Sequence, residues 1–228
     1  MTSQPYYIVA DYRRHVANLL ATYPREDALS WAVGGPDPNT PLIERAILEV
    51  AGLKPDSDLV DIGCGSGRLT LVLDPDRPGS YLGTDIVPEL LDQVRPQRPG
   101  WRFELVDDLV IPDENESADM ACLYSVITHL RHEDSYALLA EVARVIRPGG
   151  TIVVSFLEFA VPALWSTFET TVASRNLDHP TTAYVERNVL EIWATHLLLE
   201  PTDYCPGDRP FVNGREPLGQ SVTVLRKW

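Results

Sequence analysis

The sequence predicts an α/β fold, in which helices cover both faces of a mostly parallel, doubly wound sheet. Short apolar runs alternate along the chain with amphipathic helical patterns, as is typical of parallel sheets. A glycine-rich turn at 63–67 separates the first of these apolar runs from the helical pattern that follows it. The 228 residues suffice for one domain of this kind with a full hydrophobic core.

The residues before the first expected strand predict helices and a loop. Apolar positions at helical spacing over 11–22 predict a first helix, and the Gly, Pro and Asn content of 31–39 predicts a loop. Thr40 is then expected to cap a helix that has Pro41 at its first position and ends before Gly52. The apolar face of that helix is expected to consist of Leu42, Ile43, Ala46, Ile47 and Val50.

Five parallel strands are expected in the alternating part of the chain, with helices between them, the clearest at 134–146. In such sheets, ligands bind outside the carboxyl ends of the strands. The motifs described below all fall at those ends. The strands are expected near 58–62, 80–84, 101–105, 119–124 and 151–156.

The last third of the chain departs from a minimal domain of this type. Residues 157–180 form an expected insertion with a helical pattern at 161–174, and a further helix is expected near 185–195. Short apolar runs at 197–199 and 221–225 predict the last two strands. The intervening segment is rich in Pro and Gly, and a loop of this length is usually functional or mobile.

These patterns predict a single domain over residues 1–228. Its expected parts are an N-terminal helical cap (1–40), a core (41–156), an insertion (157–185), and a C-terminal part (186–228) with a long loop at 200–220.

Composition restricts the partners and the compartment. A net charge of −14 opposes binding to nucleic acid, which depends on neutralising phosphates. No apolar run is long enough to span a membrane, and residues 1–5 lack the pattern of a secretory signal. Cys64, Cys122 and Cys205 form no C-x-x-C pair and predict neither a disulfide nor a metal site. We therefore expect a cytoplasmic monomer or homodimer that binds a small molecule and no membrane, nucleic acid or metal.

The glycine turn predicts a ligand site. Asp61 ends an apolar strand, and Gly63, Gly65 and Gly67 follow at alternate positions. Because glycine lacks a Cβ, a ligand can lie directly on the backbone there, and the next helix is expected to offer free N–H groups. One βα unit later, Asp85 ends a second strand, where it can accept hydrogen bonds from a ribose diol.

This constellation resembles the class I S-adenosylmethionine (SAM)-dependent methyltransferases. The resemblance covers roughly residues 40–156 and includes three later segments in the family's order, at 103–112, 117–130 and 138–150. It implies a Rossmann-like methyltransferase fold with a final antiparallel strand, SAM as the cofactor and methyl transfer as the reaction.

The resemblance also implies roles for individual residues. Asp61 would support the methionine amino group, directly or through water, and Asp85 would bind the ribose hydroxyls. Asp107 is favoured over Asp108 as the contact to adenine, because it lies five residues before Pro112. The other residues that the resemblance places at the cofactor are Gly63, Cys64, Gly65, Ser66, Gly67, Ile86 and Ser125.

His129 is the candidate general base. It follows the fourth strand at the ligand edge, and histidine titrates near neutral pH. A base assists methyl transfer to a hydroxyl or to a protonated amine, whereas the transfer itself mainly requires alignment of the acceptor. A structural histidine that caps a turn or packs under a lid explains the position equally well. His132 is expected at the exposed start of the next helix, and His196 at the start of a strand.

The acceptor pocket is less well specified. Glu158, just after the fifth strand, could bind a cationic acceptor. Aromatic residues in the variable segments are candidates as a group, although any single one is more commonly an ordinary core or surface residue. They are Tyr12, Trp31, Phe156, Phe159, Trp165, Tyr204 and Phe211, and His179 lies in the same variable part.

Several functions remain open at this point. Methyl transfer from SAM to an oxygen of a small molecule is the leading hypothesis, and N-methylation of an amine or peptide is the alternative. A nicotinamide-dependent oxidoreductase shares the strand, the glycines and the acid, but its fingerprint is G-x-G-x-x-G rather than G-x-G-x-G. A non-catalytic SAM-binding protein is disfavoured, because no glycine or acid of the pattern is missing.

Overall fold

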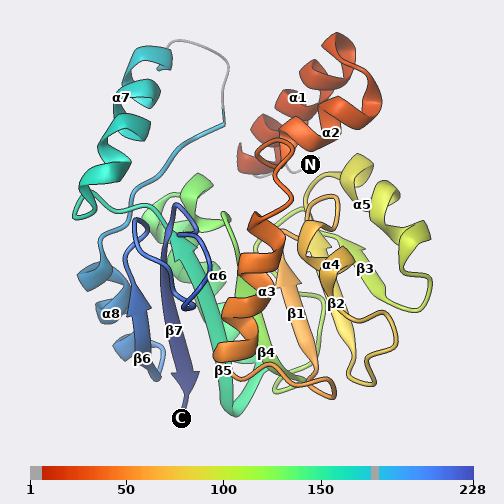
Figure 1. The fold of residues 1–228 in the computed structure, drawn as a ribbon. Helices are drawn as coiled ribbons and strands as arrows, with labels where there is room; N and C mark the ends of the chain where they lie inside the picture. The colour runs from red at the N-terminus through yellow and green to blue at the C-terminus, as the bar shows by residue number, and fades with distance from the viewer. Residues whose placement is uncertain (1–6, 176–179) are drawn as a thin grey trace, which may run out of the picture.

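A seven-stranded sheet forms the centre of the molecule (Figure 1). The computed structural model describes residues 7–175 and 180–228. The strand order is β3-β2-β1-β4-β5-β7-β6, with β7 antiparallel to both neighbours and the other pairs parallel, which confirms the predicted fold class. The strands are β1 (Leu59–Ile62), β2 (Tyr81–Asp85), β3 (Arg102–Leu105), β4 (Ala118–Leu123), β5 (Ile146–Phe156), β6 (Leu199–Cys205) and β7 (Ser221–Lys227).

Two apolar layers hold helices against the two faces of this sheet. Alternate strand residues point to opposite faces, so in β4 Met120 and Cys122 belong to one cluster, and Ala121 and Leu123 to the other. Helices α3, α4 and α5 pack on the first face, and α6 and α8 on the second. Their bounds are α3 (Thr40–Val50), α4 (Arg68–Val72), α5 (Pro88–Val94), α6 (His132–Val145) and α8 (Arg187–His196).

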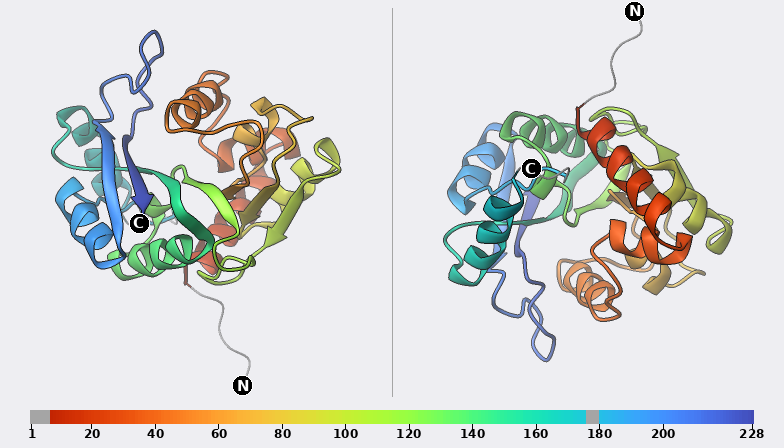
Figure 2. Two further views of the ribbon diagram at one scale, coloured as in Figure 1. Left: turned by 90° about the horizontal axis from the view of Figure 1, so that it is seen from below. Right: turned by 90° about the horizontal axis from the view of Figure 1, so that it is seen from above.

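The remaining helices lie at the carboxyl ends of the parallel strands (Figures 1 and 2). Helices α1 (Tyr7–Thr22) and α2 (Arg25–Ala32) pack on each other and on Val87 and Leu90. Helix α7 (Trp165–Ser174) buries none of its residues. The end of the sheet where a ligand is expected is therefore covered from two sides. No helix among the described residues is both long and apolar enough to cross a membrane.

Helix α3 differs in detail from its prediction. The N-cap position is Asn39 rather than Thr40, which is the first helical residue, and Gly52 follows the helix with a φ of +109°. Leu42 and Val50 are 39% and 60% exposed, because the face of the helix that packs on the sheet does not include them. The buried residues of the helix are Pro41, Ile43, Ala46, Ile47 and Leu48.

Other boundaries also differ from expectation, and β5 starts at Ile146 rather than near 151. The predicted loop at 31–39 begins two residues late, because α2 continues to Ala32. His196 ends α8 rather than opening a strand, since the chain turns through Leu198 at a φ of +57° before β6 starts. Strand β6 then continues to Cys205, so the expected loop at 200–220 is confined to 206–220.

Candidate cofactor and acceptor site

A cavity of about 510 Å³ lies at the carboxyl ends of β1, β2 and β4. Its volume is in the range of small-molecule sites. The core supplies most of its wall, but Tyr12 of α1, Thr167 of α7 and Gln220 before β7 also line it. Segments far apart in the sequence therefore close over one space at the predicted ligand edge.

The glycine turn forms one wall of the cavity. Gly65 has a φ of +56°, and a Cβ built on it would lie 2.8 Å from Cγ1 of Val33. Gly67 has a φ of +87° and is the N-cap residue of α4, outside the cavity wall. Only glycine adopts such backbone conformations without strain. Because α4 has only five residues, the turn offers backbone N–H groups and surface for close approach rather than the dipole of a long helix.

Asp61 is held inside the protein at the end of β1. It is 3% exposed, and its carboxylate accepts hydrogen bonds from the hydroxyl of Tyr81 at 2.6 Å and the thiol of Cys122 at 3.5 Å. Burial raises the pKa of Asp61 to about 6 despite these hydrogen bonds. Asp61 reaches the cavity, but much of its hydrogen-bonding capacity is used internally.

Asp85 connects the second strand to the glycine turn. One carboxylate oxygen accepts the N–H of Gly65 at 2.8 Å, and the other accepts the N–H of Val87 at 2.9 Å. Burial raises the pKa of Asp85 to about 6. The carboxylate therefore holds the turn in place, and its remaining lone pairs are beside the cavity that it lines.

The two consecutive acids after β3 have different surroundings. Asp108 lines the cavity, whereas Asp107 does not. The side chain of Asp107 is 70% exposed and accepts a hydrogen bond from Arg13 at 2.6 Å. Arg13 also donates to the carbonyl of Ile86 at 2.6 Å. The acid that was favoured for the cofactor thus ties α1 to the core, and Asp108 is the one at the cavity.

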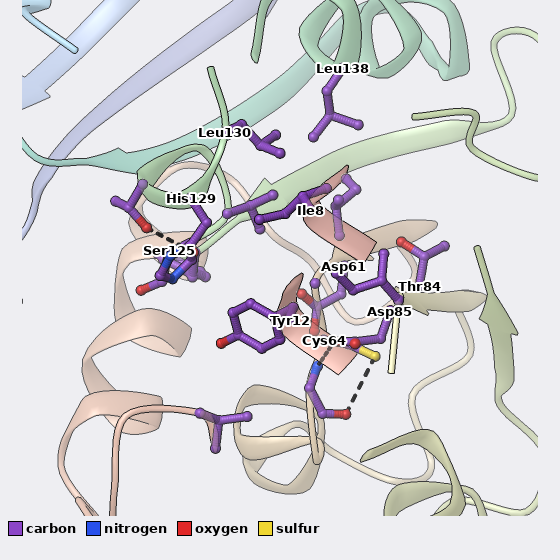
Figure 3. Close-up of a pocket in the computed structure, with 18 of the residues that line it drawn as sticks. Ile8, Tyr12, Asp61, Cys64, Thr84, Asp85, Ser125, His129, Leu130 and Leu138 are labelled. Carbon is purple, nitrogen blue, oxygen red and sulfur yellow. Dashed lines mark hydrogen bonds between the residues drawn. The ribbon is translucent and has the colours of Figure 1, made fainter. Parts of the chain in front are cut away.

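His129 ends the short 3-10 helix η2 (Ile127–His129) after β4 and lines the cavity. Its Nδ1 lies 2.8 Å from the carbonyl oxygen of Thr181, which can only accept, so Nδ1 carries the proton in this contact. Burial lowers the pKa of His129 below its ordinary 6.5. Its ring contacts Tyr12 edge-on, with 5.4 Å between centroids. Figure 3 shows Tyr12 between His129 and the side of the cavity formed by Cys64 and Asp85.

Ser125 follows β4 in a strained conformation, with a φ of +58°. Its N–H donates to the hydroxyl oxygen of Ser155 at 2.8 Å, and its own hydroxyl oxygen accepts from the amide of Gln220 at 2.6 Å. The Ser155 hydroxyl donates in turn to the amide oxygen of Gln220 at 2.7 Å. The end of β4 is therefore fixed by a residue that precedes β7.

The cavity brings together most of the residues predicted from the sequence. Gly67 and Asp107 lie outside its wall. The predicted residues that line it are Asp61, Gly63, Cys64, Gly65, Ser66, Asp85, Ile86, Asp108, Ser125 and His129.

The acceptor candidates are mostly elsewhere. Tyr12 lines the cavity, but Phe156 is buried in the core and Trp31 is exposed. Glu158 is 1% exposed and accepts hydrogen bonds from the hydroxyls of Tyr204 and Ser221, so it is not free to bind a cationic ligand.

The other candidates also lie outside the cavity wall. Phe159 and Trp165 form an aromatic cluster with Phe168 and Tyr184 on the insertion. His132 starts α6 in an exposed position, as predicted. His179 lies outside the described residues.

Sequence reasoning missed Glu44 and Arg68 as cavity residues. Burial raises the pKa of Glu44 to about 8. The apolar residues of α3 lie on one face of the helix, and Glu44 lies beside that face. A polar residue in this position is usually exposed to solvent, which is why sequence reasoning missed it. In the described part of the chain, no group of three His, Cys, Asp or Glu side chains could hold a metal ion.

Comparison with known proteins identifies the central segment of the chain. Residues 60–154 match the family model of a methyltransferase domain. The malonyl-[acyl-carrier protein] O-methyltransferase of Serratia marcescens is 30% identical over 57% of this chain and 51% of its own. The carboxy-S-adenosyl-L-methionine synthase of Vibrio campbellii is 28% identical over 45% of each chain. Matches of this kind span about a third to a half of the length of the curated relatives.

Solved structures agree in fold. The 1,6-didemethyltoxoflavin-N1-methyltransferase of Burkholderia thailandensis, solved with 1,6-didemethyltoxoflavin and S-adenosylhomocysteine, has a TM-score of 0.65 and 16% identity. The alignment covers 100% of this chain and 92% of that one. The matched segment contains the glycine turn and Asp85. Residues 60–154 therefore match a methyltransferase domain, the described residues have the fold of SAM-dependent methyltransferases, and S-adenosylmethionine is the cofactor.

Proposed function

We propose that the protein transfers the methyl group of SAM to an oxygen atom of a small-molecule acceptor, with His129 as the general base. The observation that carries this proposal is the position of His129 in the same cavity as the glycine turn and Asp85. A base and a cofactor cradle in one cavity meet the requirements for methylating a hydroxyl group.

The cavity residues fit the cofactor. The glycine backbone allows the methionine part to approach closely, and Asp85 has lone pairs for the ribose hydroxyls. Asp108 lines the cavity, as Ile86 does, whereas Asp107 does not, which supports Asp108 as the contact to adenine. When bound, SAM supplies an activated methyl group on a sulfonium, so the protein has to align the acceptor and exclude water.

The tautomer of His129 suits a base. Its Nδ1 proton is directed at the Thr181 carbonyl, which leaves the lone pair of Nε2 as the acceptor of a proton. Because burial lowers its pKa, the imidazole is neutral at pH 7 and able to take that proton. The acceptor hydroxyl would bind on the Nε2 side and lose its proton as the methyl group is transferred.

Two segments outside the core support an enclosed acceptor site. We propose that the helical cap and the insertion cover the acceptor through residues 7–40, 157–175 and 180–185. Tyr12 supplies a ring against His129, and the Tyr12 hydroxyl is anchored to the carbonyl of Ala32 at 2.8 Å. The N–H of Ala183 donates to the carbonyl of Thr128 at 2.7 Å, which fixes the insertion beside His129.

A turnover screen tests this function. The protein is incubated with SAM and panels of phenols, carboxylic acids, sugars and amines, and release of S-adenosylhomocysteine is followed. Turnover with oxygen acceptors is expected. Turnover with amines alone would contradict O-methylation, and an absence of turnover with every panel, despite SAM binding, would favour a non-catalytic SAM-binding protein.

Asp85→Ala is expected to weaken binding of S-adenosylhomocysteine by about 1–3 kcal/mol, which is roughly 5- to 150-fold. The substitution removes a carboxylate that binds ribose and also the acceptor for the Gly65 N–H. Calorimetric titration measures the change, with Asp92→Ala as a control, because Asp92 is an exposed residue of α5 paired with Arg95. Unchanged affinity in Asp85→Ala would show that Asp85 does not bind the ribose.

A further inference from the structure

Glu44 is a carboxyl group in the cavity that has no hydrogen-bonded partner. Its backbone carbonyl accepts the hydroxyl of Tyr124 at 2.9 Å, which fixes this turn of α3 over the end of β4. Its side chain lines the cavity. Among the described residues, no hydrogen bond or ion pair reaches its carboxylate. The residue is half-buried, and the cavity desolvates its carboxylate. A desolvated carboxylate without a partner in a ligand cavity indicates that the ligand supplies the partner.

The charges around Glu44 favour a cation. Asp61 on β1 and Asp37 in the loop before α3 repel the ionised form of Glu44, whereas Arg68 on α4 attracts it. The thiol of Cys122 and the phenol of Tyr124 on β4 are the other titratable neighbours. Burial, the largest cause, raises the pKa of Glu44 to about 8. At neutral pH the empty cavity therefore holds this carboxyl mostly protonated, and a bound cation would make it release the proton.

The other carboxylates considered for this role are already occupied. Asp61 accepts hydrogen bonds from Tyr81 and Cys122, and Glu158 accepts them from Tyr204 and Ser221. Among residues 7–175 and 180–228, Glu44 is the carboxyl that lines the cavity without a hydrogen bond to either oxygen. Arg68 beside it uses one guanidinium nitrogen to donate to the carbonyl of Val33.

We propose that Glu44 binds the ammonium group of a ligand in this cavity. One source of an ammonium is the amino-acid end of the cofactor, whose carboxylate could pair with the nearby Arg68. The other source is an acceptor that carries an ammonium group in addition to the hydroxyl that is methylated, in which case the inference rests on the proposed methyl transfer. Both sources present the same chemistry to Glu44, and binding experiments separate them.

Glu44→Gln tests the proposal, because it removes the charge and retains the size of the side chain. Glu49→Gln is the matched control, since Glu49 lies on the same helix outside the cavity and forms an exposed ion pair with Arg45. S-adenosylhomocysteine, which carries the ammonium, and methylthioadenosine, which lacks the amino-acid part, are titrated calorimetrically into each variant. Buffers of different ionisation enthalpy report the protons released on binding.

If the ammonium belongs to the cofactor, Glu44→Gln weakens S-adenosylhomocysteine at least tenfold, leaves methylthioadenosine unchanged and abolishes most of the proton release. If it belongs to the acceptor, both affinities are unchanged. Thermal-shift titrations of the protein saturated with S-adenosylhomocysteine then show amines, but not the matching alcohols, binding at least tenfold more weakly to Glu44→Gln.

The proposal is overturned if Glu44→Gln behaves like Glu49→Gln with both nucleosides and with the amine panel. These measurements require no turnover, so they can fail while methyl transfer to an oxygen acceptor is observed. Conversely, failure of every acceptor to be methylated does not affect the titration with S-adenosylhomocysteine.

Discussion

Gly65→Val is expected to abolish measurable binding of SAM and S-adenosylhomocysteine. The φ of +56° at Gly65 is strained for a β-branched residue, and its Cβ would lie 2.8 Å from Cγ1 of Val33. The sequence alone suggested that a larger side chain would fill ligand space. In the structure, the new valine side chain would first clash with the side chain of Val33, so the turn has to move. The Gly65 N–H then loses its alignment with Asp85, which is also the ribose candidate.

Gly100→Val is the control for this substitution. Gly100 has open space around its Cβ position and no positive φ. Circular dichroism and thermal melting check that both variants fold, and calorimetry measures the affinity. A folded Gly65→Val protein that binds SAM with the wild-type affinity would show that the turn does not cradle the ligand.

His129→Asn is expected to lower turnover by roughly 10²-fold or more while leaving affinity for SAM nearly unchanged. The asparagine amide can still donate to the Thr181 carbonyl, so the structural contact of Nδ1 is retained and the base is lost. His129→Ala removes both. His132→Ala is the control, because His132 lies three residues later and outside the cavity wall.

The pH profile gives a second readout for His129. Burial lowers its pKa from the ordinary 6.5, so the imidazole becomes protonated, and unable to act as a base, only below that pH. The wild-type rate is expected to fall on the acidic side, with the midpoint of the fall below pH 6.5. If His129→Asn retains both the wild-type rate and this acidic limb, another group is the base or alignment alone drives transfer.

The sequence predicted the sheet and the glycine turn that lines the cavity, because both depend on local patterns. Apolar runs bounded by turn residues placed β1, β2, β3 and β4 to within one residue, and the Gly63–Gly65 spacing follows β1 directly. The two acids at 107 and 108 show the limit of such patterns. The side chains of consecutive residues point in different directions, and the sequence does not specify which of the two points into the cavity. In the structure, Asp107 does not line the cavity and contacts Arg13 of α1.

The acceptor side could not be predicted because it depends on contacts between distant segments. Glu158 follows β5 at the ligand edge, but the hydroxyls of Tyr204 on β6 and Ser221 on β7 donate hydrogen bonds to its carboxylate. Glu44 belongs to a helix whose polar residues are expected in solvent. Its side chain is desolvated because the helix packs over the ends of β1 and β4, which the sequence does not reveal. Helix α2 was missed because its apolar residues are too few to predict a helix on their own, and they become buried only through contact with α1 and α5.

The cavity wall extends beyond the segment that the family model matches. That segment ends at residue 154, yet Tyr12 and Glu44 precede its start, and Thr167 and Gln220 follow its end. The cavity is therefore encoded in more than one stretch of the gene, a central stretch that matches the family model and flanking stretches that do not. A relative that shares only the central stretch can be expected to share the methyl donor, and its acceptor has to be established from its own flanking segments.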